Sequence, residues 1–312
     1  MPLVAVVGPT ATGKSALAMS LAEIFGGEII SCDSTAVYRG VDIGTDKVSS
    51  EDRRGIPHHV IDIVDPTETY SAAAYARAAS EAVRSTLERG RLPILAGGTG
   101  LYYRALVRGM FPGPARDTAL RDRLVAVASG RGVESLHRWL TRVDPESARR
   151  IQPRDTKRLV RALEVYLLTG RPMTEHFADT RSPIEGLPVL TLGVSMGRPE
   201  LRERVSRRVD QQLARGVVGE VRDLLAAGVP ANAHAFSGLV YRQVVELLAG
   251  RRDQAATREL IVRENMRYAR RQLIWFRKEP NVRWLDGPGE SPATVATARA
   301  LVAQFLQQPH GD

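Results

Sequence analysis

The chain has 312 residues, 43% of them hydrophobic and 25% charged, which allows one large α/β domain or two domains with separate cores. Its 44 basic and 35 acidic residues give a net charge of +9, which points to a polyanionic partner, although arginine-rich codon usage would produce the same excess. The single cysteine, Cys32, excludes an intrachain disulfide framework and a multi-cysteine metal site. No apolar stretch is long enough to span a membrane, and the N-terminus leads straight into a predicted core strand. We therefore expect a cytoplasmic protein with no membrane partner.

A phosphate-binding loop follows the first predicted strand. The strand Leu3–Val7 leads into residues 8–15, and a helical pattern continues over Ala16–Phe25. The loop fits G-x-x-x-x-G-K-[ST], in which backbone N–H groups surround phosphate oxygens, and a chance glycine-rich turn would lack this strand–loop–helix context. We expect Lys14 to reach the terminal phosphates and Ser15 to ligate Mg²⁺. The predicted loop residues are Gly8, Pro9, Thr10, Ala11, Thr12, Gly13, Lys14 and Ser15. The motif predicts a phosphorylated ligand but not the reaction.

Further apolar, β-branched runs alternate with helical patterns such as Ala72–Arg89. They predict buried strands at Glu28–Cys32, His59–Ile63, Pro93–Ala96 and Val189–Val194. This alternation indicates an α/β fold with a parallel sheet and helices on both faces. Ligands of such sheets bind at the carboxyl ends of the strands, so chemistry is expected there.

Two polar positions follow predicted strands at that edge. Asp33 comes directly after Glu28–Cys32 and suits a general base or a metal ligand, but it equally suits a helix N-cap. Thr99 offers a hydroxyl in the tight turn Gly97–Gly100. The second acidic strand end of nucleotide-hydrolysing phosphate-loop proteins is not evident, because Asp62 is not clearly placed. Cys32 is interpreted as a small buried hydrophobe, and His58 and His59 are assigned no role.

A helical block interrupts the α/β pattern after Phe111-Pro-Gly-Pro114. We predict an insertion over 112–185, which leaves 1–111 and 186–312 as the α/β core. Helices are predicted at Ala119–Ala128, Val133–Val143, Pro145–Ile151 and Thr156–Thr169. A helical region over 199–278, an edge strand at Arg283–Leu285 and a helix from Pro292 complete the core.

Two helical stretches are rich in arginine. Between Glu146 and Arg161 six basic residues face two acids, and between Arg251 and Lys278 nine basic residues accompany Tyr268, Trp275 and Phe276. Basic and aromatic side chains together suit a nucleic-acid groove, whereas a solvated helix face with core aromatics would show the same pattern. Three further arginines either share that surface or point at a phosphate: Arg204, Arg207 and Arg208.

Taken in order, these segments resemble the tRNA dimethylallyltransferase family over nearly the whole chain. The set is specific as a whole, although only the phosphate loop is specific by itself. One departure is Val240, where the family usually has glycine before Tyr241; a left-handed backbone there would make valine costly. The matching segments are 8–15, 33–38, 42–45, 57–58, 62–66, 70–71, 97–102, 158–164 and 241–242.

The resemblance implies transfer of a dimethylallyl group from its diphosphate to N6 of adenine 37, next to the anticodon of tRNA. The phosphate loop would then hold a diphosphate leaving group, with Lys14 and Mg²⁺ on Ser15 stabilising its charge. The family analogy adds Arg208 as a second diphosphate clamp and Asp33 as the base that accepts the N6 proton. Thr99 joins these catalytic residues by analogy.

The resemblance also implies a tRNA surface, and we expect the enzyme to be a monomer. The insertion would clamp the anticodon stem-loop, and the target base would leave its stack to enter the site. The positions that match tRNA contacts are Asp33, Ser34, Thr35, Ala36, Thr99, Arg121, Lys157, Arg158, Leu159, Val160, Arg161, Ser237, Gly238, Leu239, Val240, Tyr241 and Arg242.

Three rival functions are considered. Prenylation of a free adenine nucleotide would need neither the insertion nor the basic helices. A small-molecule kinase would use ATP on the same loop, but the missing acidic strand end opposes it. A non-catalytic RNA-binding module would leave the intact loop and Asp33 unexplained.

Overall fold

The computed structural model describes residues 2–308, and the chain divides into two compact units. The first unit combines Met1–Val107 with Pro183–Asp312, and the second is Arg108–Ser182. Each unit has its own hydrophobic core. Among residues 2–308, no helix combines the length and the apolar character that a membrane span requires.

The first unit is built on a six-stranded parallel sheet with the order β3-β2-β4-β1-β5-β6. The strands are β1 Leu3–Val7, β2 Gly27–Cys32, β3 His58–His59, β4 Leu92–Gly97, β5 Val189–Ser195 and β6 Val282–Asp286. In the register, Gly97 is the partner of both Val7 and Cys32. The turns after β1, β2 and β4 therefore meet at one edge of the sheet.

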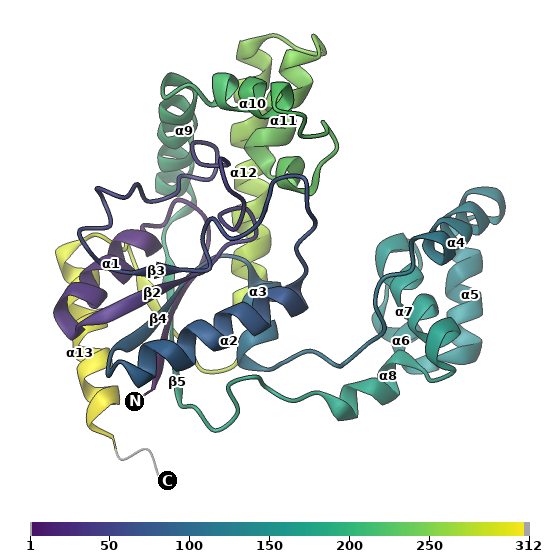
Figure 1. Cartoon of the computed structure of the whole chain (residues 1–312), viewed down its shortest axis with the longest axis horizontal. Helices are drawn as coiled ribbons and strands as arrows, with labels where there is room; N and C mark the ends of the chain where they lie inside the picture. The colour runs from purple at the N-terminus through teal and green to yellow at the C-terminus, as the bar shows by residue number, and fades with distance from the viewer. Residues whose placement is uncertain (1, 309–312) are drawn as a thin grey trace. The chain divides into compact units, whose positions relative to one another are not determined.

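Alternating side chains of each strand point to two helical layers. Val4 and Val6 of β1 pack in one cluster with Leu17 of α1 (Lys14–Phe25) and Val302 of α13 (Pro292–Gln307). Leu3, Ala5 and Val7 belong to the opposite cluster, which includes Tyr75 of α2 (Ala72–Glu88) and Tyr102 of α3 (Gly100–Val107). Figure 1 shows these two helix pairs on opposite faces of the sheet. This two-sided burial is why the strands read as continuous apolar runs.

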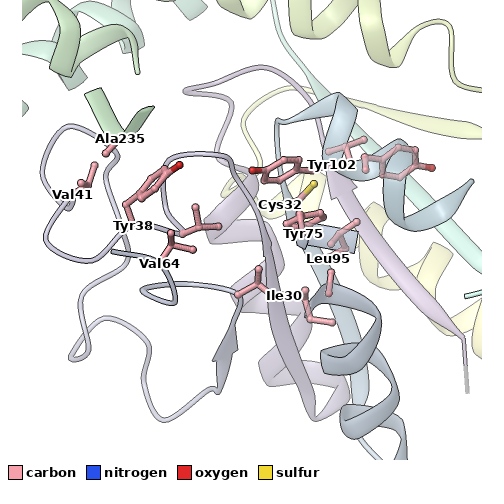
Figure 2. Packing of buried hydrophobic residues seen from close by; sticks show 14 of the residues in the cluster. Ile30, Cys32, Tyr38, Val41, Val64, Tyr75, Leu95, Tyr102 and Ala235 are labelled. Atoms are coloured by element: carbon pink, nitrogen blue, oxygen red, sulfur yellow. The ribbon is translucent and has the colours of Figure 1, made fainter. Parts of the chain in front are cut away.

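Aromatic packing supports the second layer next to the carboxyl end of β2. The rings of Tyr75 and Tyr102 stack with centroids 4.0 Å apart, and Figure 2 shows Cys32 beside them. Burial raises the pKa of the Cys32 thiol to about 12. The thiol therefore stays protonated, as expected of a small buried hydrophobe.

Four further helices cover the carboxyl edge of the sheet. They are α9 Arg198–Ala214, α10 Val217–Ala226, α11 Leu239–Leu248 and α12 Gln254–Phe276, with the short 3₁₀ helix η2 His234–Ser237 before α11. Side chains of α9 and α12 reach the loops after β1 and β4, as described below. This layer supplies the groups that complete the site.

The second unit is helical. It contains α4 Thr118–Arg131, α5 Val133–Val143, α6 Pro145–Arg150, α7 Thr156–Thr169, α8 Met173–His176 and the 3₁₀ helix η1 Phe177–Asp179. Asp117, Asp144 and Asp155 cap α4, α6 and α7 by accepting hydrogen bonds from first-turn N–H groups. Leu136, Leu140 and other apolar side chains of α4–α7 form its core.

One predicted strand is wrong. The run His59–Ile63 was expected to form a strand, but β3 ends at His59. Val60 and Asp62 have φ angles of 58° and 57°, in the left-handed region, so the chain cannot continue as an extended strand. The other predicted strands are confirmed, and β6 lies at the sheet edge as expected.

Candidate active site

The phosphate loop connects β1 to α1. Gly8 has a φ of 138°, and an added Cβ there would lie 2.4 Å from the backbone oxygen of Val194. Gly13 has a φ of 84° and is followed directly by the first residue of α1. Both positions therefore require glycine, which explains their place in the motif.

Lys14 lies inside this loop. Its ammonium group donates a hydrogen bond to the backbone oxygen of Pro9. Burial, followed by the charge of Arg208, lowers the pKa of Lys14 to about 7, while Asp33 opposes the shift. A bound anion would favour the charged form of this lysine.

Two pockets adjoin at the carboxyl edge of the sheet. The first, the phosphate-loop pocket, is lined by loop residues including Gly13, Lys14 and Ser15. The second, the outer pocket, is lined by Ser34, Thr35 and the segment Ser237–Arg242. The side chains that line both are Thr10, Asp33, Thr45, Arg208 and Tyr268. These shared residues form the boundary between the two pockets.

Asp33 uses one carboxylate oxygen to fix its own turn. Its Oδ1 accepts hydrogen bonds from the backbone N of Thr35 at 2.8 Å, the hydroxyl of Thr35 at 2.6 Å and the backbone N of Ala36 at 3.3 Å. Within residues 2–308, Oδ2 has no hydrogen-bond partner. Asp33 can therefore cap its turn through Oδ1 and still have Oδ2 available for catalysis, so the two interpretations are compatible.

Thr99 is tied to the same turn. Its hydroxyl oxygen accepts a hydrogen bond from the backbone N of Ser34 at 3.1 Å, and its own backbone N donates to Cys32 at 3.1 Å. Thr99 lines neither pocket. It is therefore a support of the Asp33 turn in this structure.

Two of the three candidate arginines on α9 reach the phosphate loop. Arg208 donates from Nη1 to the hydroxyl of Thr10 at 2.7 Å. Arg204 donates from Nε to the backbone oxygen of Ala11 at 2.9 Å and pairs with Glu290 at 2.5 Å. Arg207 instead pairs with Glu203 on the exposed face of the helix.

Sequence reasoning missed the role of Gln272 on α12. This buried side chain accepts a hydrogen bond from the backbone N of Thr10 at 2.8 Å and donates to the backbone oxygen of Gly98 at 2.9 Å. It therefore joins the phosphate loop to the turn after β4. The available signal was a polar residue within the buried stripe Ala269, Gln272 and Phe276.

Tyr268 lies one helical turn before Gln272 and lines both pockets. Burial raises the pKa of Tyr268 to about 12, with a further contribution from the Asp33 charge, while a hydrogen bond with Thr99 opposes the shift. From the sequence, this tyrosine could be identified only as one of the aromatic residues in a basic stretch. Its place at the pocket boundary depends on how α12 packs.

In the second unit, two of the expected tRNA-contacting arginines share a buried carboxylate. Arg121 and Arg161 both reach Glu164 Oε2, at 3.0 and 2.8 Å, and the Glu164 side chain is fully buried. Leu159 and Val160 lie in the core of this unit. Of the positions in this unit that match tRNA contacts in the family, Lys157 and Arg158 are the exposed ones.

Residues 36–279 match the protein family described as IPP transferase. The chain belongs to this family. Similar proteins named tRNA dimethylallyltransferase include that of Solibacter usitatus, 47% identical over 99% of this chain and 100% of the relative. The protein of that name from Thermomicrobium roseum is 49% identical over 91% of this chain and 86% of the relative. The family resemblance inferred from the motifs is confirmed.

Solved structures in the family share the fold. The tRNA isopentenylpyrophosphate transferase of Bacillus halodurans aligns with a TM-score of 0.73 and 37% identity, covering 98% of this chain and 97% of that chain. A eukaryotic dimethylallyltransferase acting on tRNA aligns with a TM-score of 0.81 and 25% identity, covering 99% and 82%. The predicted α/β fold with a phosphate loop is confirmed.

The valine that departs from the family pattern is not strained. Val240 is the second residue of α11 and has no left-handed φ, so this position needs no glycine. Its side chain is buried in the core of the first unit. The strain that a left-handed backbone would cause is therefore absent.

Proposed function

We propose that this protein transfers the dimethylallyl group of dimethylallyl diphosphate to N6 of adenine 37 in tRNA and releases diphosphate. The observation that carries the proposal is the boundary between the two pockets, where Asp33 and Arg208 line both. A donor held by the phosphate loop and an acceptor base in the outer pocket would meet at this boundary. Because both pockets are built from one chain, a monomer suffices.

The phosphate loop would stabilise the leaving group. As the allylic C–O bond breaks, its electron pair goes to the diphosphate, and negative charge builds on the oxygens beside the loop. Lys14, Arg208 and the N–H groups of the loop other than that of Thr10 would face this charge in a partly enclosed pocket. Fixed donors of this kind favour the transition state because they need no rearrangement as the charge develops.

Asp33 would accept the proton of the attacking amine. The N6 nitrogen forms the new C–N bond and loses a proton, which Asp33 Oδ2 is free to accept because Oδ1 holds the turn. The adenine amine is a weak nucleophile, since its lone pair is delocalised into the ring. A positioned base therefore contributes to the transfer step.

We propose Mg²⁺ as the cation that accompanies the diphosphate. Among residues 2–308, no group of three or more His, Cys, Asp or Glu side chains could hold a metal alone. The phosphate-loop pocket offers the Ser15 hydroxyl as a ligand, and Asp33 Oδ2 is left to accept the proton. This sparse set fits Mg²⁺, which keeps waters and binds phosphate oxygens with few protein ligands. When bound, the ion would neutralise charge on the leaving group.

The helical second unit and the basic helices would bind the anticodon stem-loop. Lys157 and Arg158 are exposed on α7, and Arg263, Arg267 and Arg270 lie along α12. Phosphate contacts from such side chains give salt-dependent affinity. A tRNA substrate also favours the cytoplasm as the place of action.

A transfer assay with alternative acceptors tests the proposal. The protein is incubated with Mg²⁺, donor labelled in the prenyl group, and either unmodified tRNA or AMP. We expect label in tRNA and none in AMP. Label in AMP would favour nucleotide prenylation instead, and ATP consumption without donor would favour a kinase.

A further inference from the structure

The turn Gly44–Asp46 forms a wall shared by the two pockets. Thr45 lines both pockets, Gly44 the outer pocket, and Asp46 the phosphate-loop pocket. Arg208 donates from Nη2 to the backbone oxygen of Thr45 at 3.2 Å. The position of this turn therefore influences where the guanidinium group of Arg208 lies.

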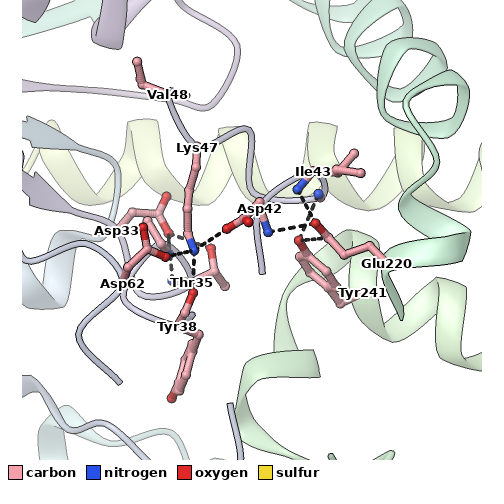
Figure 3. Close-up of polar contacts among 12 residues, drawn as sticks. Asp33, Thr35, Tyr38, Asp42, Ile43, Lys47, Val48, Asp62, Glu220 and Tyr241 are labelled. Carbon is pink, nitrogen blue, oxygen red and sulfur yellow. Dashed lines mark hydrogen bonds and ion pairs between the residues drawn. The ribbon is translucent and has the colours of Figure 1, made fainter. Parts of the chain in front are cut away.

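Two side chains from the helical layer fix the start of this turn. Glu220 of α10 accepts hydrogen bonds from the backbone N of Asp42 at 3.0 Å and of Ile43 at 2.8 Å. The hydroxyl of Tyr241 donates to Glu220 at 2.6 Å and accepts from the backbone N of Gly44 at 2.9 Å. Figure 3 shows Tyr241 and Glu220 pointing together at the turn.

The side chain of Tyr241 is buried against the Gly44–Asp46 turn. Its side chain is 1% exposed, and a Cβ at Gly44 would lie 2.6 Å from the ring, so the ring packs directly against the turn. Burial and the neighbouring Glu220 raise the pKa of Tyr241, which keeps the hydroxyl protonated as a donor. Although Tyr241 belongs to the segment matched to tRNA contacts, its hydroxyl is used within the chain.

Asp46 fixes the end of the turn and holds Arg208. Its Oδ2 pairs with Arg208 Nε at 2.5 Å, and its Oδ1 pairs with Arg215 Nη1 at 2.9 Å. The residue has a φ of 53°, a left-handed conformation that Asp and Asn adopt more readily than most residues. The hydrogen bonds of Arg208 to Asp46, Thr10 and Thr45 occupy its Nε–H and one N–H of each Nη atom. One N–H on each Nη atom remains for a ligand.

Lys47 anchors the far side of the same segment. Its side chain is 4% exposed, and its ammonium reaches Asp42 at 2.6 Å, Asp62 at 2.5 Å and the backbone oxygen of Tyr38. Figure 3 shows this ammonium among its three partners. The Gly44–Asp46 turn is thus held from both sides.

We propose that Asp46, Tyr241 and Glu220 are positioning residues for the transfer reaction, which hold the Gly44–Asp46 turn so that Arg208 presents its two free N–H groups to the diphosphate. This inference rests on the proposed function. A free arginine side chain has many rotamers, and fixing it before the donor binds removes part of the entropy that binding would otherwise cost. Tyr241 thereby connects the wall of the outer pocket to the diphosphate clamp.

The variants Asp46→Asn and Tyr241→Phe test the proposal. Asn tolerates the left-handed backbone and Phe keeps the buried ring, so both variants should fold. We expect kcat/KM for dimethylallyl diphosphate to fall by about 10- to 100-fold, the scale of a small misplacement of a catalytic group. The tRNA dissociation constant should change less than about twofold, since neither change removes a tRNA-facing group.

The same substitutions in an Arg208→Ala background separate positioning from general damage. If Asp46 and Tyr241 act through Arg208, adding either substitution to Arg208→Ala should change kcat/KM less than about twofold. Equal losses with and without Arg208 would overturn the inference. The matched control is Tyr103→Phe, which removes another buried hydroxyl, 2.8 Å from Thr191, and should leave kcat/KM unchanged.

Failure of this inference differs from failure of the proposed function. If the unaltered protein modifies tRNA and both variants match it in kcat/KM, the positioning role is refuted and the function stands. If the unaltered protein transfers nothing to tRNA, the proposed function itself is refuted. Measured melting temperatures of each variant check that the fold is kept.

Discussion

Lys14 has a pKa that depends on whether an anion is present. In the free protein its pKa is about 7, first because it is buried and second because Arg208 is near. A bound diphosphate would raise this pKa, since an opposite charge favours the ammonium form. Donor binding above pH 7 should therefore take up a proton.

This coupling predicts that the donor dissociation constant rises by up to about tenfold per pH unit between pH 7 and 9, because the neutral lysine must first be protonated. Calorimetric titration in buffers of different ionisation enthalpy measures the uptake. Neighbouring groups with shifted pKa values lie outside this window: the pKa of Cys32 and of Tyr268 is about 12, that of Tyr241 is above its usual 10, and that of His58 is below its usual 6.5.

The control for this prediction is Lys14→Met. It should bind the donor weakly and show no proton uptake between pH 7 and 9. Proton uptake of equal size in Lys14→Met, or none in the unaltered protein, would contradict the assignment to Lys14.

The places of single residues in the fold could be predicted where a local motif defines them. The loop over 8–15 and Asp33 at the end of β2 follow from short patterns next to apolar strands. Gln272 and Asp46 could not be found this way. Their partners, Thr10 and Arg208, lie more than a hundred residues away in the sequence, and only the packing of α9 and α12 brings them together.

Among the elements, α12 connects two of the turns that form the site. Gln272 crosslinks the turns after β1 and β4, and Gly98 allows the close approach, since a Cβ there would lie 2.2 Å from Gln272 Nε2. The helix thus aligns the phosphate loop with the turn that supports Asp33.

Gln272→Met should weaken both stability and donor binding. It leaves the Thr10 N–H and the Gly98 oxygen without their partner, which costs about 1–3 kcal/mol for each buried group. Thermal unfolding and kcat/KM for the donor measure the two effects. The matched control is Gln243→Met on α11, which removes a buried hydrogen bond to Arg252. It should lower stability only, and an equal loss of kcat/KM in both variants would contradict the crosslinking role.

Helices and strands differ in how far local sequence defines them. Helices α5 and α7 have the predicted bounds, because apolar periodicity and Gly or Asp caps mark their ends. The strand expected over His59–Ile63 failed, because nothing in the apolar run reveals the left-handed φ angles of Val60 and Asp62. Those angles let Asp62 face Lys47, which is a tertiary contact.

At the scale of the whole molecule, the break in the α/β alternation indicated that a helical segment interrupts the α/β core. We expected an insertion over 112–185, and the structure has a compact helical unit at Arg108–Ser182. Its proposed tRNA contacts stay a prediction, as do those of Ser237–Arg242. The outer pocket could not be predicted from the sequence, since it forms only where the turn after β2 meets residues of α9, α11 and α12.

The central claim is that the boundary of the two pockets joins a prenyl donor to a tRNA adenine through Asp33. The most direct measurement is mass spectrometry of nucleosides and oligonucleotides from unmodified tRNA incubated with dimethylallyl diphosphate, Mg²⁺ and either the unaltered protein or Asp33→Ala. We predict an adenosine heavier by one five-carbon unit at position 37 with the unaltered protein. The Asp33→Ala variant should bind tRNA as tightly as the unaltered protein does, but its transfer rate should be lower by about a hundredfold or more. An unchanged tRNA mass with the unaltered protein would contradict the function, and undiminished turnover by Asp33→Ala would contradict the role of Asp33.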